Sequence, residues 1–472
     1  MKGYQFEDTQ GTFHLKKAEN ISYLYFPIAG EAGLKSSLTP NLGGDAKIDQ
    51  NTFLLEPVSA ENLVNNRNSR NFWCNVKGIG SWSLTGNAAE ALSKKFTEMQ
   101  DDSEVTAGFM WQKTTRESKK YQLRGEILSF IPVEKNVEVM LVTITNTGRM
   151  AQTVTPTAAI PLYGRSADNI RDHRHVTSLL HRIETTDIGV LVTPTLSFDE
   201  RGHQVNHMTY YCVGWSGNGE KPVDFYPTAE DFVGEGGNFE RPYAIVKNAE
   251  GVKAGTRIEG LEAVGGLHFS EVTLEPEEEC SYLIFTGITE DIQEIRNLSK
   301  TYTTREMVLE ELEKTKAYWQ EKVNVAYHTG DSDFNQFMHW VSFQPILRRI
   351  YGCSFLPHHD YGKGGRGWRD LWQDCLALLI MNPDGVRQML LDNFAGVRVD
   401  GSNATIIGSK QGEFVADRNH ITRVWMDHGV WPMITTKFYI DQTGDLELLE
   451  KEAAYFKDKQ IARGTRTDTL WD

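Results

Sequence analysis

The sequence predicts a multidomain β + α protein with an N-terminal antiparallel β-sandwich, a helical linker and the first half of an (α/α)6 barrel. Three observations predict this fold class. Residues 1–288 contain runs of alternating apolar and polar residues, residues 289–330 carry charged and apolar residues at helical spacing, and residues 331–472 contain apolar segments of helical length. A chain of 472 residues has room for about three domains. We therefore expect domain boundaries near 288 and 330.

The first region contains a series of predicted β-strands with no helices between them. Its clearest runs are rich in Val, Thr, Ile, Tyr and Phe and cover 137–148, 152–164, 188–198 and 280–289. Many strands in series favour an antiparallel sandwich over a parallel α/β sheet. The sequence Asn146-Thr147-Gly148 lies between the first two runs, so it predicts a β-hairpin there.

The rest of the chain has helical periodicity. Residues 290–325 predict one or two surface helices, and residues 370–381 are so nearly apolar on all sides that we expect a buried helix. Gly444 and Asp445 should end one helix and cap the next. The remaining expected helices cover 334–352, 386–396, 427–441 and 446–458, with a polar loop at 398–422.

Helix pairs with short connections on one side and a long loop on the other indicate a helical toroid. A complete toroid needs about twelve helices of a dozen or so residues each. Residues 331–472 have room for about half of that number. We therefore expect the chain to be part of a longer protein.

Composition excludes several classes of partner. The chain has 49 Lys and Arg against 64 Asp and Glu, a net charge of -15, which argues against binding nucleic acid or an anionic membrane surface. It contains neither an apolar run of the roughly 20 residues that a membrane span needs nor an N-terminal signal peptide. The five cysteines are far apart without metal-binding spacing, so we expect reduced thiols, no metal site, no cofactor and a cytoplasmic location.

The segment GGRGWRDLWQD at 364–374 is the first candidate for chemistry. Its glycines allow a tight turn and a close approach to a ligand. Asp370 lies near the start of the following helix, where free N–H groups stabilise a carboxylate, and it shares a helical face with Asp374. A carboxylate beside a guanidinium suits neighbouring sugar hydroxyls. The alternative is a structural turn with an Asp N-cap and an Arg–Asp salt bridge.

The second candidate is DRNHITRVWMDHGVW at 417–431, which packs charged, aromatic and imidazole groups into one loop and helix start. Asp427 and Trp431 are four residues apart and should share a helix face. The alternative is again an N-cap Asp with a packed Trp.

Two further clusters carry weaker signals. Arg348 and Arg349 precede His358-His359-Asp360, but adjacent histidines on an extended segment point apart, which argues against a metal site. The basic and aromatic segment 67–73 predicts an interdomain contact, with an additional sugar subsite as the alternative.

The whole chain resembles glycoside hydrolase family 94, the inverting β-glycoside phosphorylases. WRDLWQD resembles the family's F-R-D-x-x-Q-D, and WMDHGVW followed by TGDLELL resembles its D-D-H-L-W and T-G-D pattern. The longer motifs GKGGRGWRDLWQD, DGSNATIIGSKQGEFVADRNHITRVWMDHG and FPIAGEAGLKSSLTPNLGGD are most similar to those of the 1,2-β-oligoglucan phosphorylases.

The resemblance implies roles for particular residues. Arg366 and Asp370 would hydrogen-bond the glucosyl unit; the residues implied to lie near it are Trp368, Arg369, Arg423, Trp425 and Asp427. Gly352 stands where the family usually has a phosphate-binding arginine, which leaves Arg348 as the candidate phosphate ligand. The family's general acid is an Asp in a W-N-D motif that this sequence lacks, so the acid is expected beyond Asp472.

The implied reaction is reversible phosphorolysis of a β-1,2-linked gluco-oligosaccharide to α-glucose 1-phosphate and a shortened chain. Inorganic phosphate would be the co-substrate, and a homodimer is left open. The alternatives are a phosphorylase of cellobiose, laminaribiose or chitobiose, a hydrolase on the same barrel, and an inactive carbohydrate-binding fragment. A hydrolase would need a second carboxylate to activate water, which a phosphorylase does not.

Overall fold

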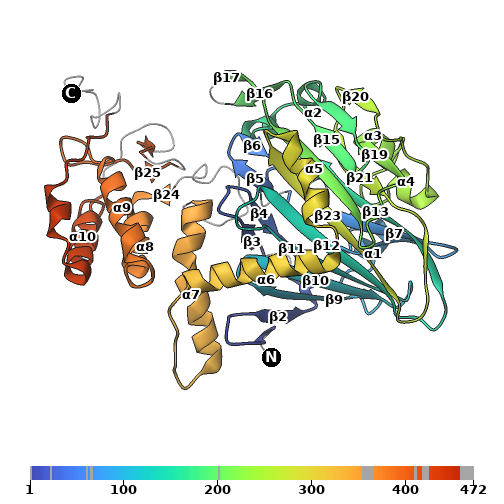
Figure 1. Ribbon diagram of the computed structural model, residues 1–472, viewed down its shortest axis with the longest axis horizontal. Coiled ribbons are helices and arrows are strands. Elements are labelled where there is room, and N and C mark those ends of the chain that lie inside the picture. The colour runs from blue at the N-terminus through green and yellow to red at the C-terminus, as the bar shows by residue number, and fades with distance from the viewer. Residues whose placement is uncertain are drawn as a thin grey trace. The chain divides into compact units, whose positions relative to one another are not determined.

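The computed structural model divides into two compact units, Met1–Trp319 (unit 1) and Gln320–Asp472 (unit 2). Unit 1 is rich in sheet and unit 2 is helical (Figure 1), which confirms the predicted fold class. No helix of the described residues is both long and apolar enough to cross a membrane. The described residues are 3–21, 24–59, 62–63, 67, 69–199, 202–352, 366–408, 412–416 and 425–457.

Two antiparallel sheets form the body of unit 1. The larger one runs, among the described residues, in the order β1 (Tyr4–Phe6), β2 (Phe13–Lys16), β9 (Asp102–Gly108), β10 (Trp111–Ser118), β11 (Leu123–Phe130), β12 (Val137–Asn146), β23 (Glu279–Thr289), β18 (Thr209–Ser216), β15 (Gly189–Val192), β14 (Arg182–Thr185) and β20 (Arg257–Glu259). The smaller one runs in the order β19 (Asp224–Thr228), β21 (Ala263–His268), β13 (Gln152–Leu162), β7 (Asn71–Val76) and β8 (Gly80–Ser83), with β22 (Val272–Leu274) also paired to β13.

Shorter elements surround these sheets. One small sheet joins β3 (Phe26–Ala29), β4 (Lys35–Leu38), β5 (Ala46–Asp49) and β6 (Thr52–Phe53), and a second pairs β16 (Leu196–Asp199) with β17 (Gly202–Val205). The helical turns are η1 (Ala18–Asn20), α1 (Ala89–Ser93), η3 (Ala167–Arg171), α2 (Arg174–Ser178), α3 (Ala229–Val233) and α4 (Tyr243–Lys247).

The two large sheets face each other and approach closely. Strands β15 and β18 pack against β21. A Cβ atom at Gly265 would lie 2.2 Å from the Cβ of Cys212 in the opposite sheet, so this approach requires a glycine. The alternating sequence therefore builds a sandwich, as predicted.

The predicted hairpin around Asn146 is wrong. Strands β12 and β13 belong to different sheets, because the chain crosses from one layer to the other after Asn146. The Asn146 amide group donates to the carbonyl oxygens of Met150 and Leu274 at 2.8 and 2.9 Å, and its oxygen accepts from the Gly148 N–H at 2.8 Å. These bonds hold an arch between sheets, since an asparagine side chain can replace main-chain partners in a turn.

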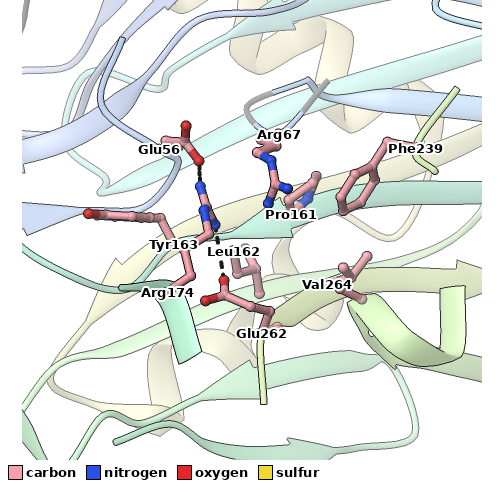
Figure 2. Close-up of a pocket in the computed structure, with 11 residues that line it drawn as sticks. Glu56, Arg67, Pro161, Leu162, Tyr163, Arg174, Phe239, Glu262 and Val264 are labelled. Carbon is pink, nitrogen blue, oxygen red and sulfur yellow. Dashed lines mark hydrogen bonds and ion pairs between the residues drawn. The ribbon is translucent and has the colours of Figure 1, made fainter. Parts of the chain in front are cut away.

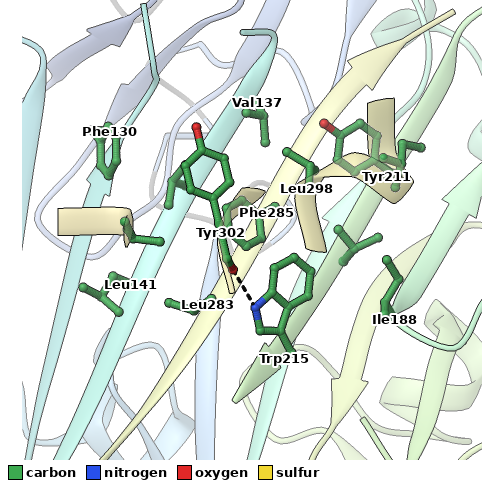
Figure 3. Close-up of a cluster of buried hydrophobic side chains, with 14 of the residues drawn as sticks. Phe130, Val137, Leu141, Ile188, Tyr211, Trp215, Leu283, Phe285, Leu298 and Tyr302 are labelled. Atoms are coloured by element: carbon green, nitrogen blue, oxygen red, sulfur yellow. Dashed lines mark hydrogen bonds between the residues drawn. The ribbon is translucent and has the colours of Figure 1, made fainter. Parts of the chain in front are cut away.

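Helices α5 (Ile292–Thr301) and α6 (Arg305–Lys322) lie in the segment predicted as a linker, and they pack on the larger sheet up to Trp319. Figure 3 shows the buried hydrophobic cluster that these helices form with the larger sheet. The Trp215 Nε1–H donates to the Tyr302 carbonyl oxygen at 3.0 Å, and the rings of Tyr302 and Phe285 stack with centroids 5.4 Å apart. The apolar faces of these helices thus complete the core of unit 1.

Two residues of the basic segment 67–73, Arg70 and Trp73, pack inside unit 1. Arg70 is fully buried in unit 1, where it forms an ion pair with Glu138 and donates to the Gly44 carbonyl oxygen at 2.9 Å. Trp73 is buried as well. Arg70 is stable inside unit 1 because the buried Glu138 carboxylate pairs with it. An interdomain contact made by the rest of the segment stays a prediction.

Unit 2 consists of helices with signals for their ends. Asp331 caps α7 (Ser332–Tyr351) by accepting from the Phe334 N–H at 3.1 Å. Gly444 ends α10 (Val430–Thr443) in the left-handed conformation, and Asp445 caps η5 (Leu446–Glu450), both as predicted. The remaining elements are α8 (Trp368–Met381), α9 (Pro383–Phe394), β24 (Arg366–Gly367), β25 (Ile406–Ile407) and β26 (Phe414–Val415).

One predicted helix of unit 2 is wrong. Residues 446–458 were expected to be helical, but only the 3-10 turn η5 forms and residues 451–457 have no regular structure. Leu446 and Leu449 are more than three-fifths exposed. Helical periodicity without burial of the apolar face does not stabilise a short helix.

Candidate active site

The start of α8 is fixed by a small sheet. Strand β24 pairs with β25, and β25 pairs with β26. The main chain then turns into α8, where the Trp368 N–H donates to the Thr405 carbonyl oxygen at 3.0 Å. Gly367 is the N-cap residue and no side chain caps the helix. Residues 366–370 therefore run from the short strand β24 directly into the first turn of α8.

Two arginines share one buried carboxylate inside unit 2. The Asp374 side chain is fully buried. Its Oδ1 accepts from the Arg348 Nε at 2.7 Å, and its Oδ2 lies 3.4 Å from a terminal nitrogen of Arg366. Arg366 is itself buried, whereas 37% of the Arg348 side chain is exposed. We name this group the inner cluster.

The pKa values of the inner cluster reflect its burial. Burial raises the pKa of Asp374, against the opposing effect of Arg348 and then Arg366. Burial also lowers the pKa of Arg366, which the Asp374 charge opposes. Hydrogen bonding to Asp374 raises the pKa of Arg348. Two guanidinium groups around one carboxylate leave a net positive charge, which suits the binding of an anion at the exposed arginine.

Asp370 lies in the first turn of α8 and is half-buried. Its Oδ2 would lie 2.1 Å from a Cβ atom at position 367, so the carboxylate can fold back over the helix start only because residue 367 is glycine. No described residue donates a hydrogen bond to Asp370 or pairs with it. Its carboxylate is therefore available to a ligand.

A second pair, the outer cluster, joins the surface of α8 to the turn before α10. The Arg369 Nε is 2.7 Å from the Asp427 Oδ2, and both side chains are more than two-fifths exposed. The Trp431 Nε1–H donates to the same oxygen of Asp427 at 3.3 Å. Desolvation tends to raise the pKa of Asp427, but the Trp431 hydrogen bond and the Arg369 charge hold it below its usual value. The prediction that Asp427 and Trp431 share a helix face is wrong, because Asp427 lies in the turn before α10 (Val430–Thr443). The hydrogen bond from Trp431 brings the two side chains together instead.

His428 and two tryptophans complete the group. The His428 Nδ1 is 3.1 Å from the Asn403 Nδ2, and the Trp425 ring stacks on the imidazole with centroids 5.9 Å apart. Trp425 is 46% exposed, so it can offer an aromatic face to a sugar. Burial lowers the pKa of His428; Asp427 and Asp370 raise it, and Arg369 lowers it.

Trp368 is buried beneath this group and forms a hydrogen bond with it. It is 1% exposed, and its Nε1–H donates to the His428 carbonyl oxygen at 3.0 Å. A Cβ atom at Gly396 would lie 2.5 Å from its ring. Trp368 therefore packs in the core and positions the loop that carries His428.

The structure brings most of the predicted site residues into related positions. Arg348 and Arg366 meet at Asp374, Arg369 meets Asp427, and Trp368 holds His428. Arg423 lies outside the described residues, as do the predicted cluster His358-His359-Asp360 and the first half of the 417–431 segment. Whether these residues bind substrate or phosphate stays a prediction.

Two contributors received no role from the sequence. Asp374 was noticed only as a helical neighbour of Asp370, and Asn403 fell inside the predicted polar loop. A signal for Asp374 existed, because an aspartate inside an otherwise apolar helix needs a charged partner nearby. No local signal exists for Asn403.

The hollow of unit 1 that Arg67 lines is too small for a sugar. A hollow of about 20 Å³ is lined by Glu56, Arg67, Arg174 and Glu262, and Figure 2 shows these side chains. Arg174 pairs with Glu56 and also reaches Glu262 at 3.2 Å. This volume holds about one water molecule and no pyranose ring, so the cluster ties strands and loops together.

Comparisons with known proteins agree with this architecture. A family model described as the glycosyl hydrolase 94 supersandwich domain matches residues 58–305. A second model, the glycosyl hydrolase 94 superfamily catalytic domain, matches residues 318–466.

Two curated relatives and one solved structure are similar to the chain. It is 24% identical over 268 residues, 54% of its length, to the cyclic beta-(1,2)-glucan synthase NdvB of Rhizobium meliloti (strain 1021), and it covers 8% of that protein. It is 25% identical over 239 residues, 50% of its length, to the 3-O-beta-D-glucopyranosyl-beta-D-glucuronide phosphorylase of Paenibacillus borealis, and it covers 29% of that protein. A structure described as a kojibiose phosphorylase from the human microbiome superposes with a TM-score of 0.51 at 9% identity, covering 94% of this chain and 57% of that one.

Proposed function

The chain belongs to the glycosyl hydrolase 94 family, and from this premise we propose that the whole protein carries out reversible inverting phosphorolysis of β-1,2-linked gluco-oligosaccharides. The products are α-glucose 1-phosphate and a shortened oligosaccharide. The observation that carries the proposal is the carboxylate of Asp370, which pairs with none of the described residues, near the positively charged inner cluster. A sugar holder on α8 and an anion holder on the adjacent α7 are what a phosphorylase needs.

Asp370 would hold the glucosyl unit. A carboxylate with free oxygens accepts hydrogen bonds from two neighbouring hydroxyls, and charged acceptors make the stronger bonds. Trp425 offers an exposed aromatic face to the sugar ring. Arg369 and Asp427 are exposed enough to exchange their mutual contact for sugar hydroxyls.

Arg348 would hold the phosphate. Within the described part of the chain its guanidinium donates to Asp374 through Nε and one terminal nitrogen, which leaves the other terminal nitrogen for an anion. Arg366 adds positive charge but is buried. Asp374 positions both arginines and does not itself contact substrate in this proposal.

The reaction replaces the bond between C1 of the terminal glucosyl unit and the glycosidic oxygen by a bond between C1 and a phosphate oxygen. Attack from the face opposite the leaving group inverts the configuration from β to α. The leaving oxygen takes a proton from a general acid. No base is needed, because phosphate is already an anionic nucleophile. The prediction that the acid lies beyond Asp472 stands as part of the proposal.

The β-1,2 linkage is supported by sequence motifs and by a relative that is named for β-(1,2)-glucan. The second candidate is a β-1,3-linked substrate such as laminaribiose, because the other relative is named for a 3-O-β-glucopyranosyl bond. A panel of sophorose, laminaribiose and cellobiose distinguishes these candidates.

The test is to incubate the complete protein with β-1,2-linked glucosides and phosphate and to measure glucose 1-phosphate. The expected result is phosphate-dependent formation of the α-anomer. Release of free glucose at the same rate with and without phosphate would show a hydrolase. Binding of the sugars without any turnover would show a carbohydrate-binding protein.

A further inference from the structure

A polar hollow of about 390 Å³ lies on unit 1, away from the residues discussed above. Its lining combines η1 and its N-cap residue with the loop that follows α1 and the start of β9. We name it the Phe96 hollow after its one aromatic residue. The residues that shape it include Lys17, Asn20, Phe96, Gln100, Asp101 and Asp102.

Two lining residues hold strained backbone conformations. Phe96 has φ +66° and Lys17 has φ +53°. A bulky residue in the left-handed region is uncommon, because its Cβ atom crowds the following carbonyl oxygen. Such outliers persist where the surrounding structure holds them, and they gather at functional sites.

Hydrogen bonds from the surrounding structure hold the lining of the hollow in place. The Phe96 N–H donates to the Gln100 Oε1 at 2.7 Å, and the Gln100 Nε2 donates to the Asn20 Oδ1 at 3.1 Å. The buried Trp82 donates from Nε1 to the Asp101 Oδ2 at 3.0 Å. These bonds connect the loop, η1 and the smaller sheet, so the shape of the hollow is fixed by hydrogen bonds.

The Phe96 ring is presented to solvent. It is 75% exposed, and the Lys95 Nζ lies 5.3 Å from its centroid. An exposed ring gains nothing from the hydrophobic effect unless a ligand covers it. The groups around it are amides, carboxylates and an amine, which bind hydroxyls rather than an apolar surface.

We propose that the Phe96 hollow is a second carbohydrate-binding site, which holds a β-glucan chain through stacking on Phe96 and hydrogen bonds to the polar side chains around it. The ring face packs against the C–H groups of a pyranose. Asn20, Asp101 and Asp102 accept from or donate to its hydroxyls. The site goes beyond the proposed phosphorolysis, because it would hold the polymer at unit 1 and perform no chemistry.

The test separates this site from the proposed active site. The complete protein carrying Asp370→Asn is run in native gels with and without soluble linear β-1,2-glucan, and with soluble β-1,4-linked glucan in parallel. We expect at least one glucan to retard it. Adding Phe96→Gly should weaken the apparent affinity roughly tenfold. Unretarded migration of the Asp370→Asn protein in both glucans would overturn the proposal.

Glycine is the informative replacement because it relieves the positive φ. Phe96→Gly should therefore keep or raise Tm while it lowers glucan affinity, a combination that a structural role would not produce. Tyr243→Ala, at an exposed aromatic residue outside the hollow, is the matched control and should bind as before. Equal glucan affinity in the Phe96→Gly and Tyr243→Ala proteins would overturn the proposal.

Lys17→Gly relieves strain on the other side of the hollow and should weaken binding by a smaller factor. If Phe96→Gly proves unstable, this variant decides the matter: unchanged binding contradicts the site. Phosphorolysis of a disaccharide distinguishes the two proposals. In protein that retains Asp370, the rate of phosphorolysis should be the same with and without Phe96→Gly. If the unsubstituted protein shows no phosphorolysis, the proposed function is refuted, but the gel result is not affected.

Discussion

The inner and outer clusters are two ion-pair groups that each include one residue of α8, Asp374 and Arg369, in opposite environments. In the inner cluster, Asp374 has no exposed side-chain surface and binds two arginines. In the outer cluster, Arg369 and Asp427 are each more than two-fifths exposed and bind each other. Burial makes an ion pair costly to break and exposure makes it easy to exchange. The inner cluster can therefore hold a fixed charge pattern, and the outer cluster can release its groups to a ligand.

The largest expected effect comes from breaking the inner cluster. Asp374→Asn leaves Arg366 buried without its carboxylate, so the free energy of unfolding should fall by about 3 kcal/mol, toward the low end for buried pairs because Arg348 can turn to solvent. Urea unfolding followed by circular dichroism measures it. Asp427→Asn is the control, and an equal loss in both variants would show that burial does not separate the clusters.

Asp370 lies on α8 between Arg369 and Asp374 in the sequence, and it tests whether a carboxylate with no partner among the described residues serves a ligand. Asp370→Asn should lower phosphorolysis about a hundredfold through the loss of two charged hydrogen bonds to sugar. Its free energy of unfolding should change by less than about 1 kcal/mol, since only the interaction with the helix N-terminus is lost. Turnover is measured as glucose 1-phosphate. Full activity with lower stability would assign Asp370 to the helix alone.

The sequence predicted what local signals determine. The end of α10 and the cap of η5 followed from Gly444 and Asp445, and alternation revealed the sandwich. The arch at Asn146 was missed because its partner Leu274 lies 128 residues away.

The candidate site also contains one feature that the local sequence predicts and one that depends on residues far apart in the sequence. The position of Asp370 at a helix start could be predicted, because the glycine turn and the apolar run are contiguous. The shared carboxylate could not, because Arg348 and Asp374 belong to different helices and are 26 residues apart. Packing of α7 on α8 brings them together, and no periodicity encodes that packing.

The outer cluster should contribute little to stability. Replacing Arg369 by Gln or Asp427 by Asn should change Tm by less than about 2 °C, and 0.5 M NaCl should reduce the difference. Scanning calorimetry of both single variants and the double variant gives the coupling. A Tm loss as large as that of Asp374→Asn would contradict the idea that the outer pair exchanges freely with solvent and ligand.

The smallest expected effect is a shift in the titration of His428, which reports the charge balance of the outer cluster. Burial lowers its pKa below 6.5, while Asp427 and Asp370 raise it and Arg369 lowers it. Asp427→Asn should therefore lower the pKa further and Arg369→Gln should raise it, which NMR titration of the imidazole can follow. As the pH falls below 6.5, His428 is protonated in the unfolded chain before it is protonated in the folded protein. The free energy of unfolding therefore decreases between pH 6.5 and the pKa of His428 in the folded protein. Asp427→Asn should steepen that loss and Arg369→Gln should lessen it. An equally large shift of the His428 pKa in Asp374→Asn would mean that the charge of Asp374 affects the imidazole as strongly as the charges of Asp427 and Arg369 do.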